Sequence, residues 1–353
     1  MGVKMLNRFL RDKTQDCLNL KPLSAYKNMR IVVDASIYMY RYIGDNALIE
    51  NYYLLCSLFR HNNISALFVF DGVPPEEKHK EIKDRADTKK KAKAEIKMIN
   101  EQLKDATPDV KKELETTKQT LQKQCIHIKQ WHMVDVKQII EATGHQYIEA
   151  PNESDHLCAK LVRDGLADAC LSEDMDMFVH GCPKVLRYMS LTKESVVEYD
   201  LYGILETLGL SFVDFQELCI LAGTDYSKWL NDKNDTTENK LVSKNIFEHY
   251  QDMIKYKYRE FSKEDDDDDD SPKKYLNFTD VKNMTKNDCS YLTWCLDQNM
   301  ITTEQYTKLQ HILAFFEGEN YPELNQEMYR PVIQSRPMNQ PLVRKVLGYH
   351  NFY

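Results

Sequence analysis

The chain has 353 residues and a formal net charge of −8, a length that allows one large domain or two modest ones with a sizeable core. No run of roughly 18 apolar residues occurs, so no transmembrane helix is expected, and the polar start MGVKMLNRFLRDK excludes a signal peptide. Nine cysteines without a CxxC pair indicate reduced thiols in an intracellular protein.

Charge is distributed unevenly along the chain. The tract EDDDDDD at 264–270 carries seven negative charges, and the remainder carries a net charge of only −1. We interpret this tract as a disordered, solvated loop that says little about partners. Residues 78–97 contain nine Lys or Arg and four acids. This basic segment is either a phosphate contact or an ordinary solvated helix with pairs such as Glu81–Arg85, and both interpretations stay open.

Short apolar, β-branched runs predict strands, and most of them are separated by helical patterns such as residues 46–63. This alternation predicts an α/β fold with a mostly parallel central sheet and helices on both faces. The predicted strands are residues 30–35, 64–71, 145–151, 166–174, 184–190 and 195–200.

Residues 76–132 interrupt this alternation. They lack a strand signal and are rich in Lys, Glu, Gln and Ala. Two helices are predicted, with a break near 106–110, where Pro108 suits a first helical turn. Because their amphipathicity is weak, we expect them to project from the core. After about residue 212 the chain is predicted to be mostly helical.

Acidic residues follow several of the predicted strands. Asp34 ends the run IVV, Asp71 ends LFVF, and Asp174 and Asp176 follow ADACL. The carboxyl ends of parallel strands share one edge of a sheet, and ligands of open α/β sheets bind there. These acids are therefore expected to lie close together.

Three further acids are expected at the same edge. Glu153 and Asp155 occupy the first turn of a predicted helix that follows a strand, and Asp225 lies in LAGTDYS. Each acid has an ordinary alternative: Asp34 could cap a helix, Asp71 could form a turn, and Glu153 with Asp155 could favour a helix dipole. Seven separate caps on one edge are a weaker explanation than one shared site.

Bare carboxylates in contact repel each other, by roughly 4 kcal/mol per pair at about 4 Å and an effective dielectric of about 20. Such a cluster requires cations, and a set of oxygen ligands suits Mg²⁺ or Mn²⁺ rather than zinc. Two ions about 3.5–4 Å apart would organise an in-line attack on a phosphodiester.

The motifs MGVKML, VVDAS, FDGVPPEEK, APNESDHLCA, SEDMDMF and AGTDYS occur in this order. In these motifs the chain resembles the flap endonuclease/XPG family of structure-specific 5′ nucleases, closer to its eukaryotic and archaeal branch. The resemblance covers residues 1–226 and implies a PIN-like nuclease core there, with a helical arch over 76–132. It implies a mostly helical DNA-binding region over 227–353, which contains the acidic loop near 264–270.

The resemblance also implies roles for particular residues. Asp155 stands where the family usually has Glu. Lys78 and Arg85 match basic residues that contact the scissile phosphate, Tyr40 matches an aromatic residue that stacks on a base, and Gly2 approaches the DNA junction. The implied metal ligands are Asp34, Asp71, Glu153, Asp155, Asp174, Asp176 and Asp225, with Asp174 also expected to be essential for catalysis.

Two departures from the family pattern stand out. Residues 227–245 contain no Gly, although the family places a Gly-x-Gly hairpin with a monovalent-ion site there, so duplex binding is expected to rest on lysines such as Lys240 and Lys244. A sliding-clamp box would begin with Gln, but the nearest stretch, LQHILAFF at 309–316, begins with Leu309. We interpret it as a core helix.

The resemblance implies an enzyme with 5′ flap endonuclease and 5′→3′ exonuclease activity that depends on two Mg²⁺ ions, with Mn²⁺ as a substitute. Its partner would be branched or flapped DNA in replication or repair. We expect a monomer away from membranes, in the nucleus or wherever DNA is replicated. The alternatives are a 5′→3′ nuclease acting on RNA and a catalytically retired scaffold that binds branched DNA.

Overall fold

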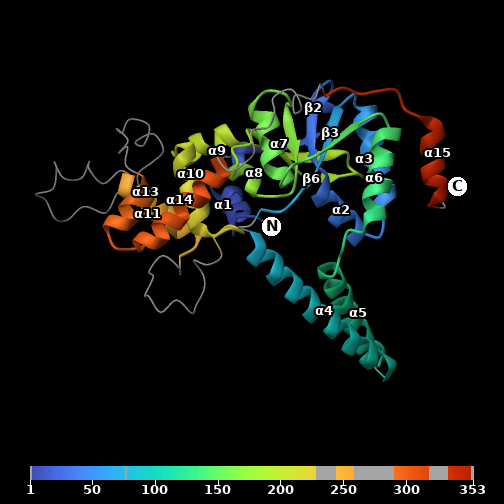
Figure 1. The fold of residues 1–353 in the computed structure, drawn as a ribbon, viewed down its shortest axis with the longest axis horizontal. Helices are drawn as coiled ribbons and strands as arrows, with labels where there is room; N and C mark the ends of the chain where they lie inside the picture. The colour runs from blue at the N-terminus through green and yellow to red at the C-terminus, as the bar shows by residue number, and fades with distance from the viewer. Residues whose placement is uncertain are drawn as a thin grey trace, which may run out of the picture.

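The computed structural model describes residues 2–75, 78–105, 107–227, 244–257, 290–317 and 333–350. Its centre is a seven-stranded sheet of order β1-β7-β6-β5-β2-β3-β4, in which all neighbours from β6 to β4 are parallel and β7 is antiparallel to both of its neighbours (Figure 1). The strands are β1 (Leu18–Pro22), β2 (Arg30–Asp34), β3 (Ser65–Phe70), β4 (Gln146–Glu149), β5 (Ala169–Leu171), β6 (Lys184–Ser190) and β7 (Ser195–Asp200).

The predicted α/β class and all six predicted strands are confirmed. Strand β1 was not predicted, because LNLKP is short and mostly exposed and owes its extended form to antiparallel pairing with β7. Strand β2 illustrates why the central strands form: Ile31 and Val33 enter the core on one face of the sheet, and Val32 enters the core on the other.

Helices cover both faces of the sheet (Figure 1). On one face the core includes residues of α1 (Leu6–Lys13), α7 (Ser154–Arg163), α8 (Asp176–Val179), α9 (Leu201–Leu208) and α10 (Phe212–Ala222). On the other face it includes residues of α2 (Ala35–Gly44), α3 (Leu48–His61), α6 (Gln130–Ala142) and α15 (Gln340–Tyr349).

The insertion between β3 and β4 contains the two predicted helices, α4 (His79–Asp105) and α5 (Pro108–Gln124). They lie side by side and project from the body of the molecule (Figure 1). Pro108 begins α5, as predicted. Only a small apolar seam, with Ala92, Ile99 and Leu121 at its centre, joins the pair, so these helices bury little and stand apart from the core.

The C-terminal part adds α11 (Ile246–Lys257), α13 (Tyr291–Asp297) and α14 (Thr303–Glu317), all packed against α10 or one another. Leu309 and Phe316 of α14 are fully buried, which confirms that 309–316 is a core helix. The acidic tract 264–270 lies outside the described residues.

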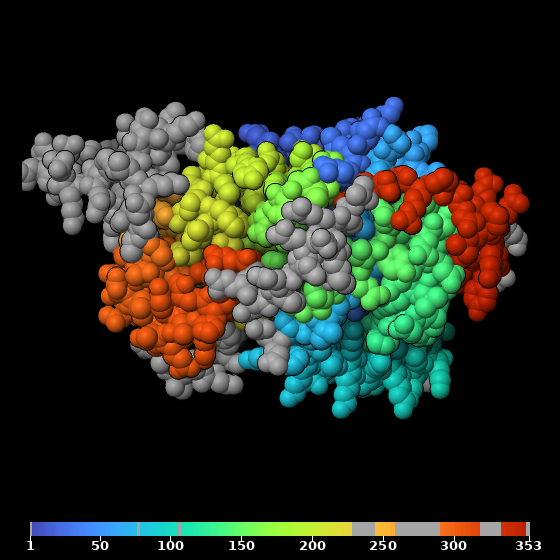
Figure 2. All heavy atoms as spheres, turned by 45° about the horizontal axis from the view of Figure 1, so that its top comes forward, coloured from blue at the N-terminus to red at the C-terminus, as the bar shows by residue number. Residues whose placement is uncertain are grey.

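Residues 333–350 return to the sheet domain. The Arg336 amide donates to the Gly144 carbonyl at 2.7 Å, and α15 packs against α6, so that the red C-terminal segment covers part of the green surface in Figure 2. Among the described residues no helix is both long and apolar enough to cross a membrane, and the eight described cysteines are free thiols.

Candidate active site at the carboxyl edge of the sheet

Two acids come from the ends of adjacent central strands. Asp34 is the last residue of β2, is 3% exposed, and also caps α2 by accepting from the Ile37 amide at 3.4 Å. The capping alternative is therefore correct but incomplete. Asp71 follows β3, and its Oδ1 accepts from both the amide (2.9 Å) and the hydroxyl (2.8 Å) of Ser154. Ser154 thus ties the start of α7 to the end of β3.

The other five acids come from three nearby segments. Glu153 is the N-cap residue of α7, and Asp155 lies in its first turn. Asp174 and Asp176 follow β5, with Asp176 beginning α8, and Asp225 follows α10. All these segments end or begin at the carboxyl edge of the parallel strands, as predicted for the acids as a set.

The acids act on one another electrostatically. Burial raises the pKa of Asp34 to about 7, helped by the charges of Asp71 and Asp174. Burial also raises the pKa of Asp155 well above its usual value, and Asp174 and Asp34 add to the effect. Like charges in a poorly hydrated site disfavour the ionised form. Full ionisation of all the acids at this edge is therefore energetically unfavourable.

Asp176 is the most telling member of the group. Burial raises its pKa well above the ordinary value, followed by the charges of Asp174 and Asp225, with a further contribution from Glu153. Its Oδ1 is buried and has no hydrogen-bond partner. A buried carboxylate oxygen without a donor is costly and calls for a cation.

Two basic side chains from the base of α4 reach the acids. Lys78, 9% exposed, pairs with Glu153. Burial lowers the pKa of Lys78, but the charges of Glu153 and Asp155 outweigh it and leave the pKa raised. Arg85 pairs with Asp225 at 3.1 Å and with Glu81 one turn earlier. The helix-pair interpretation of Glu81–Arg85 therefore holds, while Arg85 also faces the acid cluster.

Two further residues expected at the site lie beside it. Tyr40 is 40% exposed, and burial followed by the charge of Asp71 raises its pKa. Gly2 has φ +81°, and a Cβ there would lie 2.3 Å from Asp174 Oδ1 and 2.8 Å from Asp176 Oδ1. Only glycine permits both this conformation and this approach.

Of the two lysines expected to grip duplex DNA, the structure describes only Lys244. Lys244 pairs with Asp252 of α11 at 2.5 Å and is about a quarter exposed. Lys240 lies outside the described residues. A role for either lysine in binding DNA remains a prediction.

The chemistry of the donor set fits a hard divalent cation. All seven candidate ligands are carboxylates, which Mg²⁺ prefers, and the orphan oxygen of Asp176 lies among them. In the described ranges no three His, Cys, Asp or Glu side chains already form a metal cage. Several of the acids are held by protein donors instead, as the Lys78–Glu153 pair illustrates.

Three residues at the site were missed from the sequence: Ser154, Ser172 and Tyr226. Ser172 donates to Asp34 Oδ2 at 2.8 Å. The Tyr226 hydroxyl donates to Glu153, and its ring lies 5.5 Å from the Lys78 ammonium. The signal that could have found them is proximity in the sequence, because Ser154 and Tyr226 are next to a predicted ligand and Ser172 is two residues before Asp174.

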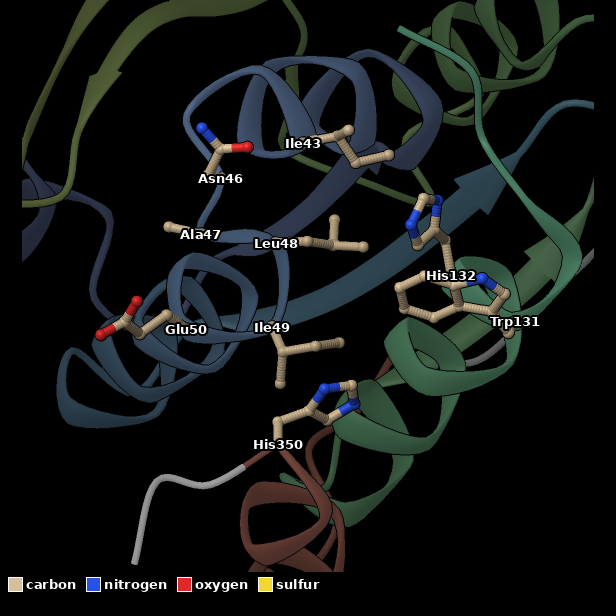
Figure 3. A pocket seen from close by; sticks show the side chains of 9 residues that line it. All are labelled: Ile43, Asn46, Ala47, Leu48, Ile49, Glu50, Trp131, His132 and His350. Carbon is tan, nitrogen blue, oxygen red and sulfur yellow. The ribbon is translucent and has the colours of Figure 1, made fainter.

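A cavity of about 340 Å³ lies elsewhere, between the α2–α3 connection, α6 and the end of α15 (Figure 3). Its walls are mostly apolar and include Ile43, Leu48 and Trp131, with His132 and His350 at one side. The cavity is lined by a single acid, Glu50. It therefore cannot substitute for the carboxylate edge as the catalytic centre.

Comparison with known proteins agrees with this geometry. Residues 1–92 match the XPG N-terminal domain, and residues 144–225 match the XPG I-region. Flap endonuclease 1 of Eremothecium gossypii is 25% identical over 262 residues, 69% of this chain and 66% of the relative. Human flap endonuclease 1 is 28% identical over 246 residues, 64% of this chain and 62% of the relative. The matches thus span slightly under two thirds of these relatives' length.

Solved structures share the fold. The catalytic core of Rad2 in complex with a DNA substrate superposes with a TM-score of 0.61 at 19% identity, covering 100% of this chain and 96% of that chain. Human GEN1 in complex with Holliday junction DNA gives 0.55 at 17% identity, covering 100% and 74%. The XPG N-terminal match ends within α4, the I-region match begins after α6, and together they contain all seven acids. Residues 1–92 and 144–225 thus carry the XPG N-terminal domain and the XPG I-region.

Proposed function

We propose that the chain is a divalent-metal-dependent nuclease that cuts DNA where a 5′ single strand meets a duplex, in replication or repair. The observation that carries the proposal is the convergence of seven carboxylates on one sheet edge at the base of a projecting helical pair. Two cations of that pair, Lys78 and Arg85, already contact acids of the cluster. The named relatives are flap endonucleases.

The cluster would hold two Mg²⁺ ions, with Mn²⁺ as a substitute. When bound, the ions neutralise phosphate charge and lower the pKa of an attacking water. Neighbouring side chains orient the carboxylates. Ser154 and Ser172 contact Asp34, while Lys78 and Tyr226 contact Glu153. The carboxylates are therefore oriented before substrate arrives, which limits reorganisation.

Hydrolysis adds the elements of water across one P–O bond, with OH placed on phosphorus and H on the leaving oxygen. Negative charge builds on the phosphate oxygens on the way. Lys78 and Arg85 would turn from their acid partners to this phosphate and stabilise that charge. Tyr40, exposed beside Asp71, would stack on the base next to the cut.

The projecting helices would select the single strand. α4 has 27 residues, so it is about 40 Å long, and α5 lies alongside it. The lysines of 78–97 would draw the phosphate backbone toward the metals. A free 5′ end would then thread under the arch before cleavage.

The activity test compares Mg²⁺-dependent cleavage of a labelled 5′ flap, a nick, a gap, a four-way junction and single-stranded RNA. We expect the flap to be cut near the junction and cleavage to vanish in EDTA. Faster cutting of the RNA would favour the RNA nuclease, and flap binding without any cutting would favour the scaffold.

The threading test uses streptavidin on a 5′-biotinylated flap. Streptavidin added before the enzyme should suppress cleavage, and streptavidin added after complex formation should trap the substrate. Equal rates in these cases and in the untreated control would show that the strand need not thread.

A further inference from the structure

Ser154 is a 1%-exposed residue that contacts two candidate ligands from different strands. Its Oγ lies 2.8 Å from Asp71 Oδ1 and 3.1 Å from Asp34 Oδ1. It belongs to α7, whereas Asp34 ends β2 and Asp71 follows β3. One hydroxyl therefore links three separate elements of the edge.

The hydroxyl has no part in building the helix. The N-cap position of α7 is Glu153, which makes no side-chain cap hydrogen bond, and both acceptors of Ser154 Oγ are acids outside α7. The Ser154 amide separately donates to Asp71 at 2.9 Å. Removing only the hydroxyl would leave the helix and that amide bond in place.

The contacts determine which oxygens remain for a cation. Asp71 Oδ1 accepts twice from Ser154, which leaves Oδ2 to turn toward a metal. Asp34 is held on Oδ1 by Ser154 and on Oδ2 by Ser172 at 2.8 Å. Asp34 is therefore held through both of its oxygens, and Asp71 is held through one.

A hydroxyl has one proton to donate, so Ser154 can serve only one of the two acids at a time. When a cation draws electron density from one carboxylate, the hydroxyl can rotate to donate to the other. Ser154 can thus donate its hydroxyl to either acid, while its amide keeps a separate bond to Asp71.

We propose that Ser154 is a positioning residue that holds Asp34 and Asp71 as a pair for divalent-cation binding. The inference rests on the proposed function, since the cations are those of the proposed nuclease. The effect of Ser154 would be exerted through Asp34 and Asp71. Its loss should weaken metal affinity by a larger factor than it slows cleavage at saturating metal.

The test is Mn²⁺ binding by calorimetry to the full chain without DNA. We expect Ser154→Ala to weaken binding roughly tenfold, as is usual for loss of a group that orients a metal ligand. The half-saturating Mg²⁺ concentration for single-turnover cleavage should rise by a similar factor. Ser154→Thr, which keeps the hydroxyl, should restore most of the affinity.

Ser57→Ala is the matched control, because the Ser57 hydroxyl is buried in α3 without a partner. It should bind Mn²⁺ like the wild type. Should the alanine variant at 154 fail to fold, Ser154→Cys repeats the test, because a thiol keeps the shape but donates only weakly.

A double-mutant cycle with Asp71→Asn adds specificity. The effects of Ser154→Ala and Asp71→Asn on Mn²⁺ affinity should be less than additive, because both act on one ligand, while Ser57→Ala should be additive with Asp71→Asn. Wild-type Mn²⁺ affinity in the Ser154→Ala variant would overturn the inference and leave the nuclease intact. A wild-type chain that binds no Mn²⁺ would overturn both.

Discussion

Carboxylates are buried in two regions of this molecule, and the two regions differ in the partners that these carboxylates have. Where α10 meets the C-terminal helices, Asp214 pairs with Lys257, both about 5% exposed. Glu217 of α10 accepts from the Ser290 hydroxyl at 2.5 Å and the Tyr291 amide at 2.9 Å. At the sheet edge, Asp176 keeps a buried oxygen without any partner. In the first region both acids have ionic or hydrogen-bond partners, whereas in the second region Asp176 has an oxygen without one.

The difference shows how buried acids separate into structural and functional ones. A buried charge with good partners joins elements, although its net contribution to stability is small. A buried charge crowded by like charges costs stability, and that cost is tolerated where the charges bind something. Burial alone would have pointed equally to Asp214 and Asp176.

The sharpest test of the comparison is Asp174→Ala. We expect single-turnover flap cleavage to fall at least about a thousandfold, because a proposed ligand of the catalytic metals would be lost. Flap affinity, measured by fluorescence anisotropy in EDTA, should change little. Retained turnover in Mg²⁺ by a correctly folded variant would remove Asp174 from the active site.

Removing the positively charged side chains of Lys78 and Arg85 should have the next largest effect. Lys78→Ala and Arg85→Ala should each slow single-turnover cleavage roughly a hundredfold, because both would stabilise charge that develops on the phosphate. Lys112→Ala, on the exposed surface of α5, is the charge-matched control. If only flap affinity falls while the rate is kept, the pair is merely part of a basic patch.

The helical region should respond in stability rather than in chemistry. Lys257→Met leaves Asp214 buried and unpaired, so the free energy of unfolding should fall by about 3–5 kcal/mol in urea denaturation. The double change with Asp214→Leu should recover much of the loss. By contrast, Asp176→Asn removes a crowded charge and should raise stability in EDTA. A loss of stability in that variant would contradict the description of the edge as electrostatically strained.

Acid should weaken the sheet domain and the helical region, because both contain buried histidines whose pKa is lowered by burial, and His145 and His249 are one example from each. Burial lowers the pKa of His145, which precedes β4, and of His249, in α11, to about 4 from an ordinary 6.5. The unfolded chain takes up these protons first, so stability is full above about pH 6.5 and declines as pH falls toward 4. The slope is at most about 1.4 kcal/mol per pH unit for each histidine.

His249→Leu isolates the helical contribution, because neither ring nitrogen of His249 has a hydrogen-bond partner. The variant should show a flatter decline between pH 6.5 and pH 4 in urea denaturation, while the contribution of His145 persists. An unchanged slope would mean that His249 is protonated in the folded protein.

Some of this structure could be predicted from local sequence patterns. Strands such as β2 and β3 are apolar runs whose periodicity and length do not depend on distant partners. The break before Pro108 was readable because proline restricts its neighbours. The edge strand β1 could not be predicted in this way, because its exposed, partly polar sequence becomes a strand only through pairing with β7.

The sequence by itself determined the alternation of strands and helices and the projecting insertion. It also predicted seven acids at one edge, in part because the carboxyl ends of parallel strands share an edge. Only the tertiary structure decided how the acids are held. Ser154 and Asp34 are 120 residues apart, and Tyr226 and Glu153 are 73 apart. Side-chain hydrogen bonds depend on contacts of a few ångströms between distant segments, and no local pattern encodes such contacts.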